Sequence, residues 1–176
     1  MKPTTITAAL IAAAALFATG CKEQGSSTPT TAAPTSTAPS WVLTSAPIDP
    51  MSITDAKASA AEGDTITIRG IIGGTMEPLS SESPVFRVVD TGLYNRCVES
   101  GDDHCATPWD YCCAPSEDVA ESSATVQLVN ADGSPYSGDP TANLNPLDEV
   151  VLVGTVGPRP NTNILTIKAT GVFRTP

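Results

Sequence analysis

Four of the five cysteines and the only histidine of this 176-residue chain lie in one short stretch, CVESGDDHCATPWDYCC, at 97–113. The residues that could do chemistry there are Cys97, His104, Cys105, Cys112 and Cys113. Thiols grouped in this way predict disulfide cross-links, a metal centre or a redox-active pair. The compartment helps to decide among them, because disulfides persist outside the cytoplasm and are rare inside it.

Two disulfides are the form that we favour for an exported chain. A bond between the adjacent Cys112 and Cys113 would be strained, because neighbouring Cα atoms are only about 3.8 Å apart and a disulfide prefers a longer separation. We therefore predict that Cys97 and Cys105 each pair with one of Cys112 and Cys113. Each cross-link would stabilise the fold by about 2–4 kcal/mol.

Two alternatives for the same sulfurs stay open. As thiolates, the four cysteines, or three of them with His104, would suit tetrahedral zinc, and thiolates also bind copper(I). The spacing differs from that of a zinc knuckle, because Cys97 and Cys105 are far apart and Cys112 and Cys113 are adjacent. A thiol–disulfide redox protein would instead use a labile bond between Cys112 and Cys113.

The N-terminal residues predict export. Lys2 precedes an apolar run at 6–18, which has the length of a signal-peptide core and is short for a membrane span. The following ATGC resembles a bacterial lipobox, so 1–20 would be a lipoprotein-type signal peptide and Cys21 the lipid anchor. A diacylated Cys21 leaves an even number of cysteines in an oxidising compartment. We expect a protein of the cell envelope, lipid-anchored on the periplasmic or surface side of a bacterial membrane.

Composition divides the rest of the chain into a tether and one domain. Residues 21–40 are rich in Ser, Thr, Pro and Ala and predict a disordered tether. Residues 41–176 have the length of a single domain with its own core. The formal net charge of −10 repels phosphate backbones, so we expect no nucleic acid partner.

The domain has the periodicity of a mainly β protein. Alternating and apolar patterns predict five strands, within 65–74, 84–92, 123–135, 150–156 and 164–173. Glycines at 70, 73 and 74 predict a bend or bulge near the end of the first strand. A β-sandwich usually needs about seven strands. We therefore predict a small five-stranded OB-like barrel, for which a helical connection before the fourth strand is typical.

Two short helical segments accompany these strands. Residues 52–64 predict a short N-terminal helix that Ser52 or Thr54 caps and Gly63 ends. Residues 141–149 predict one helical or 3₁₀ turn, because Pro146 limits its length.

A long irregular insertion, residues 93–121, separates the second and third strands and carries the cysteines. Trp109 and Tyr111 in this insertion are candidates for ligand contact, as a carbohydrate-stacking pair or a protein hot spot. The alternative that we favour is that both rings cover the disulfides and supply apolar mass.

Some of these residues resemble a known family. The pattern of helix, first strand and second strand is similar to that of bacterial exported OB-fold domains, at Ala56, Lys57, Ile68, Gly70, Ile72, Phe86 and Asp90. The segment CATPWDYCC, on a chain with a lipobox, resembles a set of uncharacterised planctomycete lipoproteins. The resemblance implies the fold and export, and it brings no activity with it.

We expect a binding module without a cofactor rather than an enzyme. His104 is the only histidine, so any acid–base or triad scheme built on histidine would have to centre on it. Its partners would be the membrane, through the lipid, and a protein, glycan or small ligand. A zinc or copper lipoprotein is the first alternative, and a thiol–disulfide redox protein is the second.

Overall fold

The computed structural model describes residues 38–101 and 105–176. The predicted signal peptide, Cys21, His104 and most of the tether lie outside these ranges, so those predictions stay predictions. No helix in the described ranges has the length and apolar character needed to cross a membrane.

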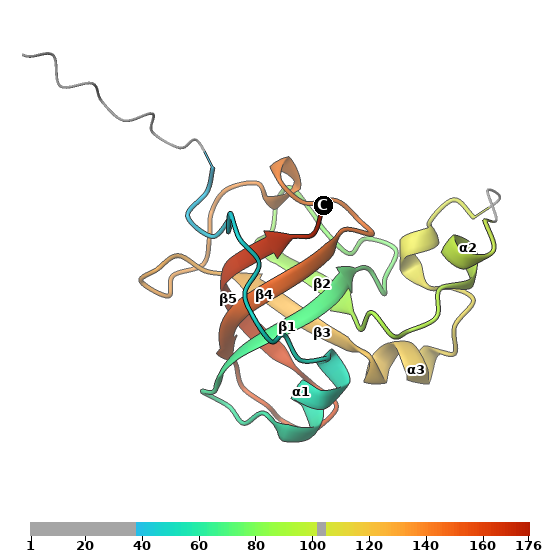
Figure 1. The fold of residues 1–176 in the computed structure, drawn as a ribbon, viewed down its shortest axis with the longest axis horizontal. Helices are drawn as coiled ribbons and strands as arrows, with labels where there is room; N and C mark the ends of the chain where they lie inside the picture. The colour runs from blue at the N-terminus through green and yellow to red at the C-terminus, as the bar shows by residue number, and fades with distance from the viewer. Residues whose placement is uncertain (1–37, 102–104) are drawn as a thin grey trace, which may run out of the picture. The chain divides into compact units, whose positions relative to one another are not determined.

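Five strands close into a barrel in the order β1-β2-β3-β5-β4, which confirms the predicted mainly β fold (Figure 1). Neighbouring strands run antiparallel, except for the parallel pair β3–β5. This closed five-stranded arrangement is that of an OB-like barrel. The strands are β1 (Thr65–Ile72), β2 (Val85–Val89), β3 (Ser123–Leu128), β4 (Glu149–Val156) and β5 (Thr166–Arg174).

The barrel interior is filled by the alternate residues that the strand periodicity predicts. In β1, Ile66, Ile68 and Ile72 are buried, whereas Arg69 is exposed. Each fully buried aliphatic side chain stabilises the fold by about 1.5–3 kcal/mol. The remaining large, fully buried side chains are Trp41, Ile53, Val88, Val89, Val126, Leu128, Val150, Leu152, Leu165 and Ile167.

The register shift in the strand ladder lies away from the glycines at which we expected a bend or bulge. It falls in the β4–β5 pair, between Val153 and Gly154. A Cβ on Gly154 would stand 2.4 Å from the Lys168 carbonyl oxygen, so the strands approach there as only glycine permits. Of the three predicted positions, Gly74 turns the chain, with a φ of 84°.

The N-terminal helix α1 (Ile53–Ser59) begins where predicted and ends early. Ser52, not Thr54, is its N-cap, because the Ser52 hydroxyl accepts the Asp55 N–H at 2.9 Å. The helix ends four residues before Gly63, since Ala60 is extended. Gly63, with a φ of 90°, turns the chain into β1 instead of capping the helix.

A buried carboxylate fastens α1 to the end of β2. Asp90 Oδ2 accepts both the backbone N–H and the hydroxyl of Thr54 at 3.1 Å, and Oδ1 accepts the Gly92 N–H at 3.1 Å. The Thr54 N–H lies in the first turn of α1, where no helical carbonyl is available to it. Asp90, a position of the family resemblance, is therefore a helix anchor in this fold.

The insertion (93–121) leaves and rejoins the barrel at one rung of the ladder. Val89 at the end of β2 pairs with Ser123 at the start of β3, and the Asp90 N–H donates to the Ser122 carbonyl at 2.7 Å. We expected an irregular insertion, and it contains three short helical pieces instead (Figure 1). These are α2 (Arg96–Glu99), η1 (Pro108–Asp110) and α3 (Ser116–Glu121).

The connection before β4 contains a short helical turn as predicted, but the turn begins one residue earlier than 141 and ends well before Pro146, which therefore does not limit it. The connection forms the 3₁₀ turn η2 (Pro140–Ala142), which Asp139 caps by accepting the Thr141 N–H at 2.7 Å. The 3₁₀ turn begins at the proline because a proline has no N–H to satisfy at that position.

Asp90→Ala should lower the free energy of unfolding by about 1–3 kcal/mol, because it removes the hydrogen bonds that the buried carboxylate accepts from Thr54 and Gly92. Urea denaturation of the full chain measures this change. The control is Glu62→Ala, which removes an exposed carboxylate and should change stability by less than about 0.5 kcal/mol. Equal stability of the two variants would contradict the anchoring role.

Candidate metal centre in the cysteine insertion

The four cysteine sulfurs of the insertion converge. Cys113 Sγ lies 3.7 Å from Cys97 Sγ and 3.8 Å from Cys112 Sγ. The sulfurs of Cys97, Cys105 and Cys112 all lie within 4.8 Å of one another. The structure thus brings together every cysteine that the sequence analysis singled out in this stretch, whereas His104 falls outside the described residues.

These separations are contacts between thiols, and the four cysteines are free in the structure. An S–S bond is about 2.0 Å long, so each sulfur pair is close without being bonded. The favoured pairing of Cys97 and Cys105 with Cys112 and Cys113 stays a prediction.

Asn95 positions Cys97. Its side-chain oxygen caps α2 by accepting the N–H groups of Cys97 at 3.1 Å and Val98 at 3.3 Å. Its amide nitrogen donates to the Pro108 carbonyl at 2.7 Å, so this one buried side chain joins α2 to η1. Sequence reasoning missed Asn95, although asparagine is a favoured N-cap residue.

Asp110 positions Cys112. One of its oxygens accepts the Thr107 hydroxyl at 2.8 Å and the other accepts the Cys112 N–H at 2.8 Å. Partial burial acts to raise the pKa of Asp110, but these hydrogen bonds outweigh it and lower that pKa. Tyr111 adopts a left-handed conformation with a φ of 59°, which turns the chain so that Cys112 and Cys113 come back towards Cys97.

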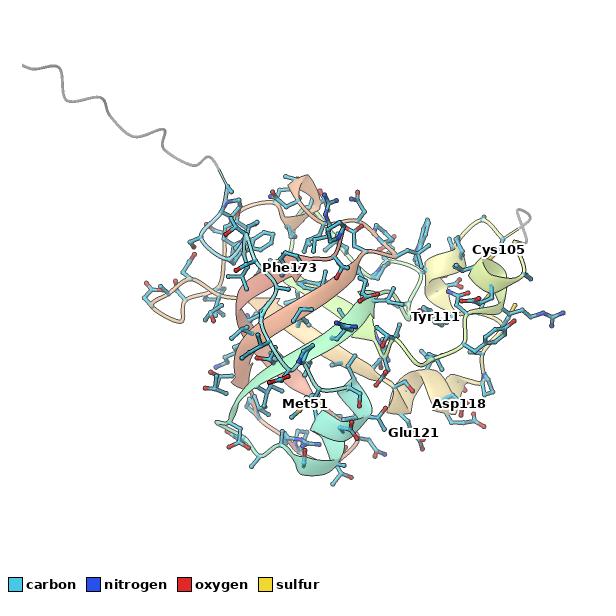
Figure 2. The ribbon with its side chains drawn as sticks, viewed as in Figure 1. Met51, Cys105, Tyr111, Asp118, Glu121 and Phe173 are labelled. Carbon is cyan, nitrogen blue, oxygen red and sulfur yellow. The ribbon has the colours of Figure 1, made fainter. Side chains whose placement is uncertain are left out.

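Two of the three aromatic residues of the insertion, Trp109 and Tyr111, dock it on the barrel. Tyr111 is only 3% exposed and lies on the side of the insertion that faces the barrel (Figure 2). Trp109 donates from Nε1 to the Met76 carbonyl at 2.9 Å, and its own carbonyl accepts the Gly74 N–H at 2.8 Å. Of the two ligand-contact candidates, half-buried Trp109 is thus the one that keeps accessible surface.

The docking requires a glycine at position 73. A Cβ on Gly73 would stand 2.6 Å from the Trp109 carbonyl oxygen and 3.1 Å from Tyr111 Cε2. Real Cβ atoms do not approach a backbone oxygen so closely, so the loop would have to move.

Two of the thiols, those of Cys97 and Cys112, have raised pKa values. A hydrogen bond with the Cys105 thiol and burial raise the pKa of Cys97 to about 11. A hydrogen bond with the Cys113 thiol and desolvation raise the pKa of Cys112. A redox thiol and a thiolate metal ligand must both lose this proton, so the raised pKa values of Cys97 and Cys112 do not distinguish the two alternatives.

Two of the sulfur separations match those of a tetrahedral thiolate site. A zinc–sulfur bond of about 2.3 Å places tetrahedral sulfur ligands about 3.8 Å apart. Cys113 already lies 3.7 Å from Cys97 and 3.8 Å from Cys112. Cys112 and Cys113 are exposed, so an ion can reach the cluster from solvent. Cys97, in contrast, is buried.

Gly73→Ala should lower the free energy of unfolding by about 1–3 kcal/mol, because the added methyl group overpacks the contact with Trp109 and Tyr111. The control is Gly157→Ala, whose Cβ would meet its neighbours at ordinary distances of 3.5–3.6 Å. That variant should be neutral or more stable by about 0.4–1 kcal/mol. Urea denaturation of the two variants compares them, and a Gly73→Ala protein as stable as the wild type would contradict the tight docking.

Comparison with known proteins adds no relative to this picture. No family model, curated protein or solved structure matches the chain. The fold assignment therefore depends on the strand order of the barrel, and the site on the positions of its own side chains.

Proposed function

We propose that the insertion (93–121) binds a thiophilic metal ion, with zinc as the first choice, through Cys97, Cys105, Cys112 and Cys113. The observation that supports the proposal is that the sulfurs of Cys97, Cys105 and Cys112 lie within 4.8 Å of one another, with Cys113 Sγ close to those of Cys97 and Cys112. Copper(I) is the second ion that this donor set suits.

A bound ion would act as a structural clip. In the part of the insertion that the structure describes, the fully buried residues are Asn95, Cys97 and Tyr111. Cys105 is half-buried. An apolar core of that size contributes little to the stability of three short helical pieces. Structural zinc supplies folding free energy directly to segments of this kind, because the site exists only when the segment is folded.

We also propose that the protein is a lipid-anchored module of the cell envelope, tethered through Cys21, and that it binds rather than catalyses. The signal-like N-terminus, the lipobox and the tether composition support this location. The OB-like barrel is a fold that often carries binding sites, although a fold assigns no ligand.

Two disulfides are the competing outcome for the same residues. Export favours oxidation, and the contact between Cys97 and Cys113 is compatible with one of the predicted pairings. Because a disulfide removes two thiolate ligands, the oxidised and metal-bound forms exclude each other and can be separated by experiment.

The full chain, purified without an oxidant, should contain about one zinc ion per molecule by elemental analysis. Cys97→Ser and Cys112→Ser should each lose most of the metal, because serine is a poor ligand for zinc. Cys21→Ser is the matched control: it makes the same exchange at the fifth cysteine and should keep the metal. Cobalt(II) in place of zinc should give the visible absorption of a tetrahedral thiolate site.

Alkylation of the metal-free chain reports the competing form. Four thiols that react only after reduction, in a protein without metal, would overturn the proposal and establish two disulfides. Four thiols that react once a chelator has removed the metal would support it.

Cys21→Ser should release the protein from the membrane fraction and abolish incorporation of a labelled fatty acid, because the thioether to the lipid cannot form. Expression in a bacterial host with a lipoprotein pathway, followed by fractionation, measures both effects. Cys105→Ser is the control and should stay labelled. A wild-type chain that carries no label would refute the lipid anchor.

A further inference from the structure

Lys57 is a buried cation that has no carboxylate partner among the residues that the structure describes. It lies on α1, is 8% exposed, and donates from Nζ to the Ala120 carbonyl of α3 at 2.7 Å. The ion pairs of the described residues are Arg69–Glu149 and Arg174–Asp148, and neither involves Lys57. Lysines are seldom so deeply buried unless they are paired, because loss of hydration disfavours the charged form.

Two arginines lie near Lys57 and add to the positive charge. Burial, and after it the charges of Arg87 and Arg159, lower the pKa of Lys57. Arg87 donates to the Ser123 hydroxyl at 2.5 Å. Arg159 donates only to backbone carbonyls in the described residues, those of Lys57, Ala60, Thr162 and Ile164. Within 38–101 and 105–176, these three cations are bonded only to neutral oxygens.

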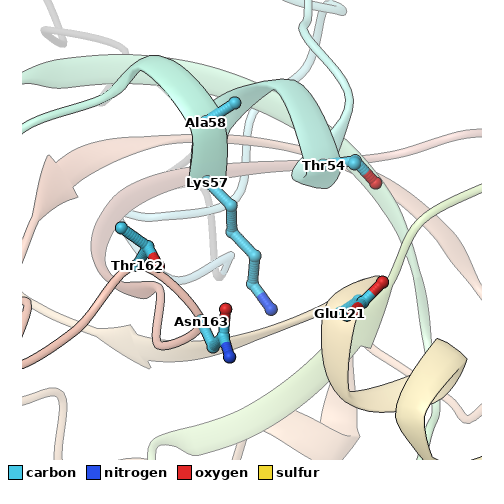
Figure 3. Close-up of a pocket in the computed structure, with 6 residues that line it drawn as sticks. All are labelled: Thr54, Lys57, Ala58, Glu121, Thr162 and Asn163. Carbon is cyan, nitrogen blue, oxygen red and sulfur yellow. The ribbon is translucent and has the colours of Figure 1, made fainter.

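The Lys57 side chain extends into a pocket between α1, α3 and the loop that joins β4 to β5. In Figure 3 the Nζ atom lies between Asn163 and Glu121. The pocket has a volume of about 220 Å³ and is lined by Thr54, Lys57, Ala58, Glu121, Thr162 and Asn163. A second hollow of about 260 Å³, lined in part by Arg87, Ser123 and Asn163, borders it.

Glu121 is the acid in this pocket, and it does not neutralise Lys57. Its carboxylate is exposed and lies beyond ion-pair distance of Nζ, although its charge raises the lysine pKa slightly. Lys57 uses one of its three N–H donors on Ala120, so donors are left for a ligand in the pocket.

We propose that this pocket binds the oxyanion group of a small ligand, a carboxylate, sulfate or phosphate, with Lys57 Nζ as the main donor and the Asn163 amide beside it. The Lys57 side chain is itself buried, so water screens its charge less than the charge of an exposed lysine. The pocket is smaller than the 300–1,000 Å³ or so of a drug-sized site, so a single oxyanion group fits it better than a polymer.

A purely structural role for Lys57 makes a different prediction. If Lys57 only joins α1 to α3, Lys57→Met lowers stability by removing the bond to Ala120 and leaves anion affinity unchanged. If it is an anion site, the ligand-free Lys57→Met protein is as stable as the wild type or more so, because it no longer buries an unpaired charge.

Titration calorimetry of the full chain with sodium sulfate, phosphate and acetate, at constant ionic strength set by chloride, tests the proposal. At least one oxyanion should bind the wild type with one site per chain. Lys57→Met should weaken that binding at least tenfold, and the arm that binds most tightly identifies the oxyanion. Lys168→Met, which removes an exposed lysine on β5, should leave the affinity within twofold.

Asn163→Ala is the second variant, in case Lys57→Met does not fold. It changes an exposed loop residue and should weaken binding at least threefold. Failure of all three oxyanions to bind the wild type would overturn the proposal. So would a Lys57→Met protein that binds the oxyanion as tightly as the wild type does. If only Asn163→Ala folds, wild-type affinity in that variant would overturn it. None of these outcomes depends on metal in the cysteine insertion.

Discussion

The backbone pairing of Val89 with Ser123 is the contact on which the insertion depends. It brings the two ends of 93–121 together, so the barrel bears the entropic cost of closing this loop. Asp90 adds a second bond, to Ser122, at the same place. Within this closed loop, the segment that carries Cys97 also has to meet the segment that carries Cys112. The hydrogen bond from Asn95 to the Pro108 carbonyl joins these two segments.

Helix α1 forms hydrogen bonds at both ends of the insertion. Thr54 binds Asp90, which precedes the insertion, and Lys57 binds Ala120, which nearly ends it. The short helix thus has tertiary partners that compensate for its length, because an isolated helix of this size is unstable in water. The same arrangement buries Lys57 and creates the pocket beside it.

The two proposed sites use opposite chemistry in one acidic chain. Thiolates attract a soft cation, and the site needs no further acidic residue. The Lys57 pocket gathers positive charge within a chain of net charge −10, so its preference for an anion is local rather than a property of the whole surface. The sites are built from different side chains and can be tested separately.

The sequence by itself determined the elements: five strands from a period of two, a helix start at Ser52, and a cysteine-rich insertion between the second and third strands. It did not show where the helix would end, since the helix stops at Ser59 and not at Gly63, nor that short helical pieces would form around Asn95 and Asp110. Only the tertiary structure decided that β3 pairs with β5, that four sulfurs converge and that Lys57 is buried. The physical reason is the sequence separation over which each interaction acts. Periodicity and capping act over a few neighbouring residues. Contacts such as that of Lys57 with Ala120 depend on how the whole barrel closes.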